Sequence, residues 1–525
     1  MPYRLTSVLG IVLLLGYWLM AALLINDYGM VYDSPKNLEE GRIHAQFLRT
    51  GQAPDPEDQP KLAYQIHGAL IPILSHLTQS LFHEKLAWVD RISAHHLIIP
   101  LLLGPFLWWL YGFFLREEGA GAAAAVSVLL ITYPHFWGHA FNNLKDVPLL
   151  ILFTFTILNF YQLTAGKSAS LRNLYFFFIG LALTITVKVT GLLILVILCL
   201  WMAGGMMARW PWTYLPRGSS ASRWNKHVAI GLIFFIVIVS LFFMPAVITI
   251  DDKLGFLAVK KKVAAVNVGL HAGQWSLYPL VQIFYATPVP MLILAVAGLL
   301  LTGLRRGKTA LDGLMFLWLF VVILVASSRY VHVYDGLRLF LVFLIPFCYF
   351  TWRGIAVIAS WFKPLMAGKA SLIAAGLLVI TLLANIAGMV QTHPYETTYY
   401  NQLAGGLGGA QKKQIGSSFD YWLNSYRQAV NWLNKNAVSH ANILVMNADS
   451  QYLLNYYELR EDFAYDHIRK LPLPPNSYII VPYRDGWPNM YDVSYEAIIK
   501  YCESLPVVHS EERQGGNIFK IYFTP

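Results

Sequence analysis

The sequence predicts a mainly α-helical, polytopic membrane protein that carries a small soluble α/β domain at its C-terminal end. Hydrophobic side chains make up 56% of the 525 residues and charged ones only 13%, and the mean hydropathy is +0.49. Apolar runs of membrane-spanning length recur from residue 7 to about residue 391. From residue 392 the pattern becomes that of a soluble α/β fold. We therefore expect a transmembrane domain at 1–391 and a soluble domain at 392–525.

About eleven runs are candidates for spans, although several are short for the roughly 20 residues that a bilayer requires. They lie at 7–29, 92–115, 119–133, 146–165, 171–187, 191–207, 228–250, 283–304, 310–328, 337–361 and 371–391. The first has Arg4 before an apolar core, as a signal peptide has, but the core is too long, so we expect a retained anchor. Polar side chains interrupt the segment 67–82, which we interpret as an interfacial helix in the long outside loop 30–91.

The basic residues indicate which loops share a side. If 67–82 does not cross, arginines and lysines gather in loops such as RRGK at 305–308, which the positive-inside rule makes cytoplasmic. The net charge of +10 then reflects membrane topology, and we expect no nucleic-acid partner. The loops 134–145 and 329–336 and the C-terminal domain fall on the opposite side. Three lysines at 260–262 in an outside loop are an exception to the rule.

The C-terminal domain shows alternating strand and helix patterns. A helix is expected near 425–436 and another near 494–503, with strands in NILVMNA (442–448), YIIVPY (478–483) and NIFKIYF (517–523). The GGLGGA run at 405–410 has no strand-to-helix phosphate cradle, and we expect a flexible turn there. Cys502 is the only cysteine in this polar part, so no internal disulfide can form within it.

The first candidate site residue lies in YDSPKNLEEG. Ser34 can cap a helix that Pro35 begins, and Asp33 stands just before it. A helix N-terminus favours the ionised form of Asp33. The plain alternative is an acidic residue that only decorates a helix start.

The second candidate segment is HAFNNLKDVP, a dense polar group between two spans. Lys145 could bind a phosphate, and Asp146 could orient a donor sugar or an acceptor. Alternatively, Asp146 and Pro148 only start a helix while Lys145 extends to lipid headgroups.

Two more cations stand at span ends on the same side. An unpaired Lys188 in ITVKVTG would be costly there, so a lipid-linked phosphate or an extension to the interface would suit it. Arg338 in YDGLRLF can bind phosphate through its planar fork, or it can pair with Asp335. The histidines form no tight metal motif. No cofactor is certain, and the sequence does not decide whether the site requires a divalent cation.

Several of these segments together resemble the family 39 type of membrane glycosyltransferases, including protein mannosyltransferases. They are HAFNNLKDVP, TVKVTG, YDGLR, HPYETTYYNQLAGGLGGA and the DYW at Asp420, Tyr421 and Trp422, in a match from about residue 30 to about 435. The family has a C-type glycosyltransferase fold and uses polyprenyl-phosphate sugars. The resemblance therefore implies sugar transfer to an unknown protein, lipid or glycan acceptor at the outer face of the membrane. Attack opposite the phosphate would invert the anomeric centre.

The resemblance also implies roles for individual residues. Asp33 matches the first catalytic carboxylate and Asp146 the second acidic position. The expected substrate-binding residues are Lys145, Lys188, Arg338, Asn143, His139 and Glu39. The sequence departs from the family pattern at two places. Ser34 occupies the place of a second acidic residue, so either Glu39 or Glu40 substitutes for it or the role is absent. Leu339 follows Arg338 where a histidine is common.

The expected location is a bacterial inner membrane, crossed many times and in contact with its lipids, with the C-terminal domain in the periplasm. A transporter or flippase of a lipid-linked envelope precursor is the main alternative, since intramembrane charges also mark substrate pathways. A scaffold for envelope assembly is a third. Transporters usually show internal repeats and broken helices near the midplane, whereas the charges here stand at span ends.

Overall fold

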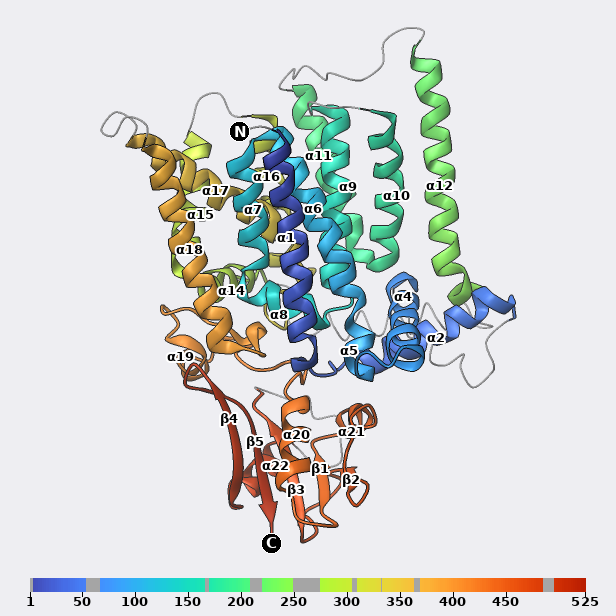
Figure 1. Cartoon of the computed structure of the whole chain (residues 1–525), viewed down its shortest axis with the longest axis vertical. Helices are drawn as coiled ribbons and strands as arrows, with labels where there is room; N and C mark the ends of the chain where they lie inside the picture. The colour runs from blue at the N-terminus through green and yellow to red at the C-terminus, as the bar shows by residue number, and fades with distance from the viewer. Residues whose placement is uncertain are drawn as a thin grey trace.

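The computed structural model describes a bundle of long helices above a small α/β unit (Figure 1). The N-terminal end of the chain lies at the far end of the bundle and the C-terminus lies in the α/β unit. The structure describes residues 3–52, 67–165, 170–207, 220–248, 274–304, 309–331, 333–362, 369–484 and 495–525. The RRGK segment and the three lysines at 260–262 lie outside these residues.

Helices form at all of the expected membrane runs. They are α1 (Tyr3–Leu24), α6 (Ile98–Glu117), α7 (Ala120–Ile131), α9 (Asp146–Thr164), α10 (Leu171–Val187), α11 (Leu193–Met207), α12 (Ser220–Ile248), α15 (Val289–Leu304), α16 (Ala310–Ser327), α17 (Leu344–Trp361) and α18 (Ala370–Thr392). Within the described ranges, eight helical stretches are long and apolar enough to cross a membrane, which makes the chain a multi-pass membrane protein.

The remaining candidates for spans are shorter or bent. Helix α7 and the following α8 (Pro134–Asn142) bend by 66° and would together make a ninth span. The helices α10 and α15 have 17 and 16 residues, or about 25 Å at 1.5 Å per residue, against a hydrocarbon core of about 30 Å. The expected number of about eleven spans is reached only if these elements also cross.

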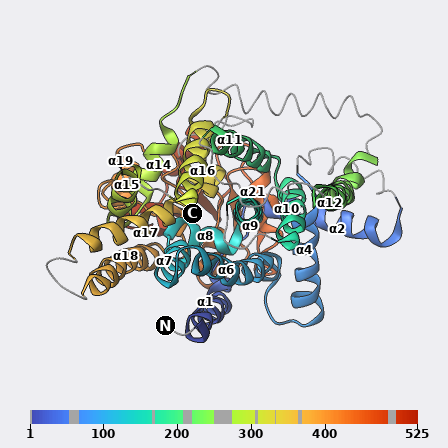
Figure 2. The same cartoon turned by 90° about the horizontal axis from the view of Figure 1, so that it is seen from above.

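The bundle has a buried centre and a lipid-facing rim. Viewed from above, α1, α12 and α18 lie at the rim, whereas α8 and α9 lie inside (Figure 2). Accordingly, 78% of the α9 span is buried but only 6% of the α12 span. Glycines allow the closest crossing: a Cβ at Gly298 of α15 would come within 1.8 Å of the Phe350 carbonyl oxygen of α17. Small residues at helix crossings are typical of membrane bundles.

Short elements gather at the end of the bundle that faces the α/β unit (Figure 1). They are η1 (Ile25–Asp27), α2 (Ser34–Thr50), α4 (Leu70–Gln79), η2 (Ser80–Lys85), α5 (Arg91–His96), α8, η3 (Val189–Leu192), α14 (Tyr278–Ala286), η4 (Arg338–Phe343) and η5 (Glu396–Thr398). Helix α4 is ten residues long, about 15 Å, which agrees with an interfacial helix. It packs closely on α2, where a Cβ at Gly41 would meet the Pro72 carbonyl oxygen at 2.0 Å.

The C-terminal unit is a five-stranded mixed sheet in the order β2-β1-β3-β5-β4. Strand β1 pairs in parallel with β2 and β3, and β5 pairs antiparallel with β3 and β4. The strands are β1 (Asn442–Val445), β2 (Ala464–His467), β3 (Ser477–Pro482), β4 (Val507–Arg513) and β5 (Gly516–Thr524), and the helices are α19 (Gly406–Lys412), α20 (Tyr426–Asn436), α21 (Ala448–Leu454) and α22 (Tyr495–Cys502).

This unit confirms three expected strands and two expected helices, with two differences. The NILVMNA strand ends at Val445, because the Asn447 side chain accepts a hydrogen bond from the Ser450 amide at 2.8 Å and caps α21. The prediction of a flexible turn in GGLGGA is wrong, since the segment forms α19. Its glycines permit close packing: a Cβ at Gly408 would come within 2.2 Å of the Gly515 carbonyl oxygen in the β4–β5 turn.

The α/β unit and the first outside loop share one hydrophobic core. Met30 and Ile92 pack in the same cluster as Tyr395 and the sheet residues of β1, β3 and β5. Arg427 of α20 also bonds Asp90 at 2.9 Å. These contacts tie the segment before α2 and the start of α5 to the α/β unit. A domain boundary at residue 391 stays a prediction.

Candidate functional site

Four chain segments bring most of the expected site residues together beneath the bundle. Asp33 stands at the start of α2, Lys145 and Asp146 at the start of α9, Lys188 at the end of α10, and Arg338 at the start of η4. Each is an element end, so the side chains meet where the helices stop. This agrees with the expectation that the outside loops face one another across one side of the bundle.

Asp33 contacts Lys145 and does not cap its own helix. It occupies the N-cap position of α2 without a side-chain hydrogen bond to the helix backbone. Its Oδ2 lies 3.5 Å from the Lys145 ammonium, and the two side chains are 36% and 28% exposed. Lys145 chiefly lowers the pKa of Asp33, while burial opposes the shift and Arg338 and Lys36 add to it. The carboxylate is therefore ionised at neutral pH, as expected, and the largest cause of its lowered pKa is a lysine from another element.

Ser34 has a different partner from the one the sequence predicted. Its hydroxyl is buried and shares a 2.9 Å hydrogen bond with Nε2 of His96 in α5. The N-cap prediction for Ser34 is wrong, because the helix begins at this residue and the hydroxyl points to another element.

Asp146 is held in a buried ion pair. One carboxylate oxygen lies 2.5 Å from the Lys188 ammonium, and the side chains are 1% and 9% exposed. The other oxygen accepts a 3.1 Å hydrogen bond from the Asn143 amide. Lys188 therefore does not extend to the interface but has a carboxylate partner inside the protein.

Asn143 organises the start of α9. Its side-chain oxygen accepts from the backbone amides of Lys145 at 3.1 Å and Asp146 at 2.7 Å, which fixes which end of the side chain is the amide nitrogen. That nitrogen also lies 3.2 Å from Nδ1 of His139, which must accept. Nε2 of His139 then carries the ring proton and donates to the Tyr421 hydroxyl at 3.1 Å.

Arg338 makes one of the two contacts that the sequence left open, the pair with Asp335. Its Nη2 donates to Asp335 at 2.7 Å, so the intramolecular pair exists. The guanidinium also stacks 4.8 Å from the Trp422 ring and 5.1 Å from the Tyr334 ring. Among the described buried polar atoms, Nε of Arg338 has no hydrogen-bond partner, and the residue is 7% exposed. This buried N–H donor therefore has no partner among the described atoms.

Two residues of the C-terminal segment join the group through long-range contacts. Tyr421 bonds His139, and Trp422 lies edge-on to the His139 ring with centroids 5.5 Å apart. Asp420 is buried and accepts from the Ser425 amide at 2.7 Å, so it shapes this turn. The sequence pointed to these residues only through the DYW motif of the family resemblance.

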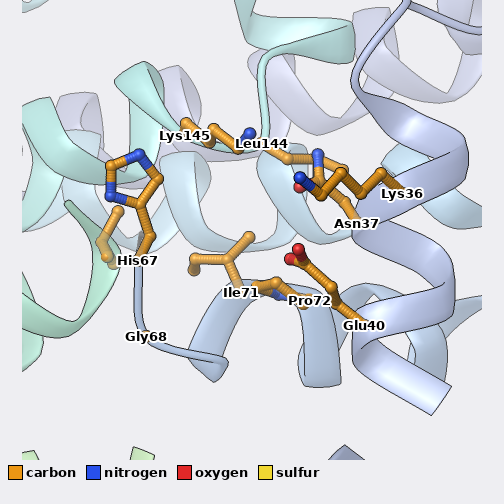
Figure 3. A pocket seen from close by; sticks show the side chains of 10 residues that line it. Lys36, Asn37, Glu40, His67, Gly68, Ile71, Pro72, Leu144 and Lys145 are labelled. Carbon is orange, nitrogen blue, oxygen red and sulfur yellow. The ribbon is translucent and has the colours of Figure 1, made fainter. Parts of the chain in front are cut away.

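A cavity of about 110 Å³ with both polar and apolar side chains in its wall lies beside the Asp33–Lys145 pair. Figure 3 shows the Glu40 carboxylate, the amines of Lys36 and Lys145 and the His67 ring around this hollow. Burial raises the pKa of Glu40, although Lys145 and Lys36 oppose the shift. Burial lowers the pKa of His67 to about 3, so its ring is neutral at pH 7, and its buried Nδ1 has no hydrogen-bond partner among the described atoms.

Glu39 and Glu40 point to different neighbours. Glu39 pairs with Arg42 at 2.9 Å and does not line the cavity, whereas Glu40 does. Of the two acidic residues that the sequence offered as a substitute for the missing second carboxylate, only Glu40 reaches the site. Adjacent residues on a helix point about 100° apart, and the pattern of charges cannot reveal which one faces inward.

An apolar groove of about 460 Å³ leads away from the ion pair between α9, α11, α16 and η4. Its walls include Phe153, Val196, Val322 and Phe340, and Lys188 is the one charged residue among the described residues that line it. The groove therefore places an apolar surface next to Lys188, whose ammonium pairs with Asp146.

The described residues include no group of three or more His, Cys, Asp or Glu side chains that could hold a metal ion. The carboxylates of Asp33 and Asp146 instead each face a lysine.

The chain is similar in structure to two proteins of known structure. ArnT from Cupriavidus metallidurans gives a TM-score of 0.47 both bound to undecaprenyl phosphate (11% identity) and in the apo state (13% identity); each match covers 98% of this chain and 97% of that chain. The Archaeoglobus fulgidus oligosaccharyltransferase in its apo form gives a TM-score of 0.45 at 11% identity, covering 86% of this chain and 60% of that one. No family model and no curated protein matches the sequence. Identities this low assign no role to any residue of this chain.

Proposed function

We propose that the chain is an integral membrane glycosyltransferase of the C-type fold that moves a sugar from a polyprenyl-phosphate donor to an acceptor at the membrane face next to the α/β unit. The observation that carries this proposal is the apolar groove with a single lysine among its described lining residues. A polyprenyl phosphate has the matching form: an apolar chain that stays in the membrane and an anionic head at its end. A soluble sugar nucleotide would have no use for such a groove.

The cations of the site suit the leaving phosphate. Lys188 stands where the groove meets Asp146. Arg338 follows on η4, whose next residues, Leu339 and Phe340, line the same groove. Its unpartnered Nε–H would donate to a phosphate oxygen, and its stacking on Trp422 holds the donor in place. Charges fixed in position before the reaction stabilise the charge that develops on the leaving group.

Asp33 is the proposed general base. An acceptor hydroxyl or amine would attack C1 of the sugar, the bond from C1 to the phosphate oxygen would break, and its electron pair would leave with the phosphate. The proton of the acceptor would pass to the Asp33 carboxylate. Lys145 keeps this carboxylate ionised, and its partly exposed position leaves room for an acceptor. Attack opposite the phosphate inverts the anomeric centre.

The polar side chains of the cavity next to Asp33 suit hydroxyl-rich substrate groups. Glu40 and Asn37 offer oxygen atoms, Lys36 and Lys145 offer N–H donors, and the neutral His67 ring offers an unpartnered nitrogen. Both hydrogen-bond polarities are present, as sugar hydroxyls require.

A bacterial inner membrane with the α/β unit in the periplasm is the proposed location, on the ground of the sequence resemblance. The cysteines Cys199, Cys348 and Cys502 are all free.

The test is transfer of a radiolabelled sugar from a polyprenyl-phosphate donor to acceptors in an envelope extract, with purified protein in lipid nanodiscs. The wild type should move label from the lipid to the acceptor fraction. Asp33→Asn should lower the rate by about 100- to 10,000-fold, the usual contribution of a general base, without loss of folded protein. Asp466→Asn, the same change at a side chain of β2 that is 48% exposed, is the matched control and should behave as wild type.

Two outcomes would contradict the proposal. Label that stays on the donor with the wild-type protein would favour a transporter or flippase. Normal transfer by Asp33→Asn would remove this carboxylate from the mechanism.

A further inference from the structure

The turn at residues 420–425, directly before α20, contacts separate parts of the candidate site. The ring of Trp422 stacks on the Arg338 guanidinium at 4.8 Å. The carbonyl oxygen of Trp422 accepts a 3.0 Å hydrogen bond from the amide of Tyr32, the residue before Asp33. This turn leads into the α/β unit, so the C-terminal part of the chain meets the site at more than one point.

One side chain of this turn, Asn424, joins three other segments. Its Oδ1 accepts a 2.6 Å hydrogen bond from the Gly29 amide and a 3.3 Å hydrogen bond from the side-chain nitrogen of Asn142, the last residue of α8. Its Nδ2 donates to the Pro394 carbonyl oxygen at 2.7 Å. The two backbone partners fix which end of the amide is the oxygen. Asn424 is only 3% exposed, so these contacts are made inside the protein.

Two of the segments that Asn424 joins lead directly to an ion pair of the site. Gly29 lies four residues before Asp33, and Asn142 lies three residues before Lys145. Asp33 and Lys145 contact each other at 3.5 Å, and both are partly exposed. A hydrogen-bonded bridge close to both residues limits how far the two loops can move apart.

The backbone of the first segment lies directly against the C-terminal part of the chain. A Cβ at Gly29 would come within 2.2 Å of the Asn424 carbonyl oxygen, a separation that only glycine permits. The next amide, that of Met30, donates to the Tyr457 hydroxyl at 2.7 Å. Consecutive residues before α2 are therefore fixed from the α/β side, and the place of Asp33 follows from them.

The turn that carries Asn424 is itself held in one conformation. Leu423 is fully buried and has a φ of 62°. A bulky residue in this left-handed region is an outlier that persists only where its surroundings determine it. The buried Asp420 carboxylate closes the turn by accepting from the Ser425 amide at 2.7 Å. Asn424 therefore reaches the two loops from a rigid support.

We propose that Asn424 is a positioning residue of the transfer reaction, which holds the Asp33 carboxylate and the Lys145 ammonium in their working places. The inference rests on the proposed role of Asp33 as general base. An error of about 1 Å in the placement of a reacting group costs roughly 100-fold in rate. Asn424 is not among the described residues that line the apolar groove. Its loss should therefore slow the reaction and leave donor binding nearly unchanged.

Steady-state transfer in nanodiscs, with the polyprenyl-phosphate sugar as the varied substrate, tests the first half of this statement. Asn424→Ala should lower kcat by about 100-fold, while KM for the donor stays near the wild-type value. Asn434→Ala is the matched control. The half-buried Asn434 also accepts from one backbone amide, that of Arg460 at 3.0 Å, and donates to one carbonyl oxygen, that of Glu458 at 2.7 Å, but both bonds lie within the α/β unit. This variant should keep the kcat and KM of the wild type.

Hydrogen exchange measured by mass spectrometry reports on the same contact without any reaction. In Asn424→Ala the peptide that covers residues 27–33 should exchange about fivefold faster at the Gly29 amide, which corresponds to the loss of one typical hydrogen bond. Asn434→Ala should leave this peptide unchanged. Gly29→Ala keeps Asn424 but forces the segment away from it, so it should show both the faster exchange and the lower kcat.

The outcomes separate this proposal from the proposed function. Transfer at the wild-type kcat by Asn424→Ala overturns the positioning role, as does unchanged exchange at residues 27–33. A higher donor KM with unchanged kcat also overturns it, since Asn424 would then serve binding. A wild-type protein that transfers no sugar contradicts the proposed function instead, and the exchange comparison still decides whether Asn424 holds the segment before Asp33.

Discussion

The buried pair of Lys188 and Asp146 leads to the sharpest energetic prediction. The two side chains are only 9% and 1% exposed, so solvent does not screen their interaction. Lys188→Met would leave a buried carboxylate without its cation, and Asp146→Leu would leave a buried ammonium. Each single change should destabilise the protein by about 3–5 kcal/mol. The double variant removes both charges and loses mainly the Asn143 hydrogen bond, about 1 kcal/mol, so it should be more stable than either single variant by about 2–4 kcal/mol.

The measurement is the free energy of unfolding in mixed micelles, from tryptophan fluorescence against denaturant with linear extrapolation. Lys145→Met is the matched control: Lys145 also pairs with an aspartate, but the two side chains are 28% and 36% exposed, and such a pair contributes about 1 kcal/mol or less. The burial argument is refuted if Lys188→Met lowers the free energy of unfolding by no more than Lys145→Met does. It also fails if the effects of the two buried changes simply add in the double variant.

Two further predictions concern the junction with the α/β unit. Burial opposes the charged form of His393, but hydrogen bonds to Glu396 at 2.8 Å and Asp27 at 3.1 Å raise its pKa above the ordinary 6.5. Its stabilising contribution is therefore complete below pH 6.5 and is lost as the pH rises through the raised pKa. His393→Gln should remove this pH dependence from unfolding curves, and an unchanged profile would contradict the assignment. Gly408→Ala should destabilise the protein by about 1–3 kcal/mol, because the new Cβ would lie 2.2 Å from a carbonyl oxygen of the β4–β5 turn. Gly376→Ala, with nothing within 4 Å, should not destabilise it, and equal losses in the two variants would reject the packing argument.

Much of the candidate site could be predicted from the sequence because charges in an apolar chain are costly and few. The segments that contain Lys145, Lys188 and Arg338 interrupt or begin apolar runs, and a membrane leaves such residues only the ends of helices or a partner. The count of spans between them then required the same side for all three, and the structure brings them together there. Their roles in a reaction stay predictions.

Partners were harder to predict than positions. Asp33 was assigned to its own helix end, yet Lys145 from another loop is the largest cause of its lowered pKa. Glu40 and not Glu39 lines the cavity. The hydrogen bond between His139 and Tyr421 joins residues 282 positions apart, and no local pattern carries such information.

The sequence by itself determined the class of the protein, the places of its helices and the end of the bundle at which its charges lie. These properties depend on the hydrophobicity of each segment and on the periodicity of its apolar residues, and each segment shows them by itself. Only the tertiary structure decided which carboxylate faces which cation, and that an apolar groove leads to Lys188. Ion pairs and cavities arise between segments, and their geometry exists only once the helices have packed.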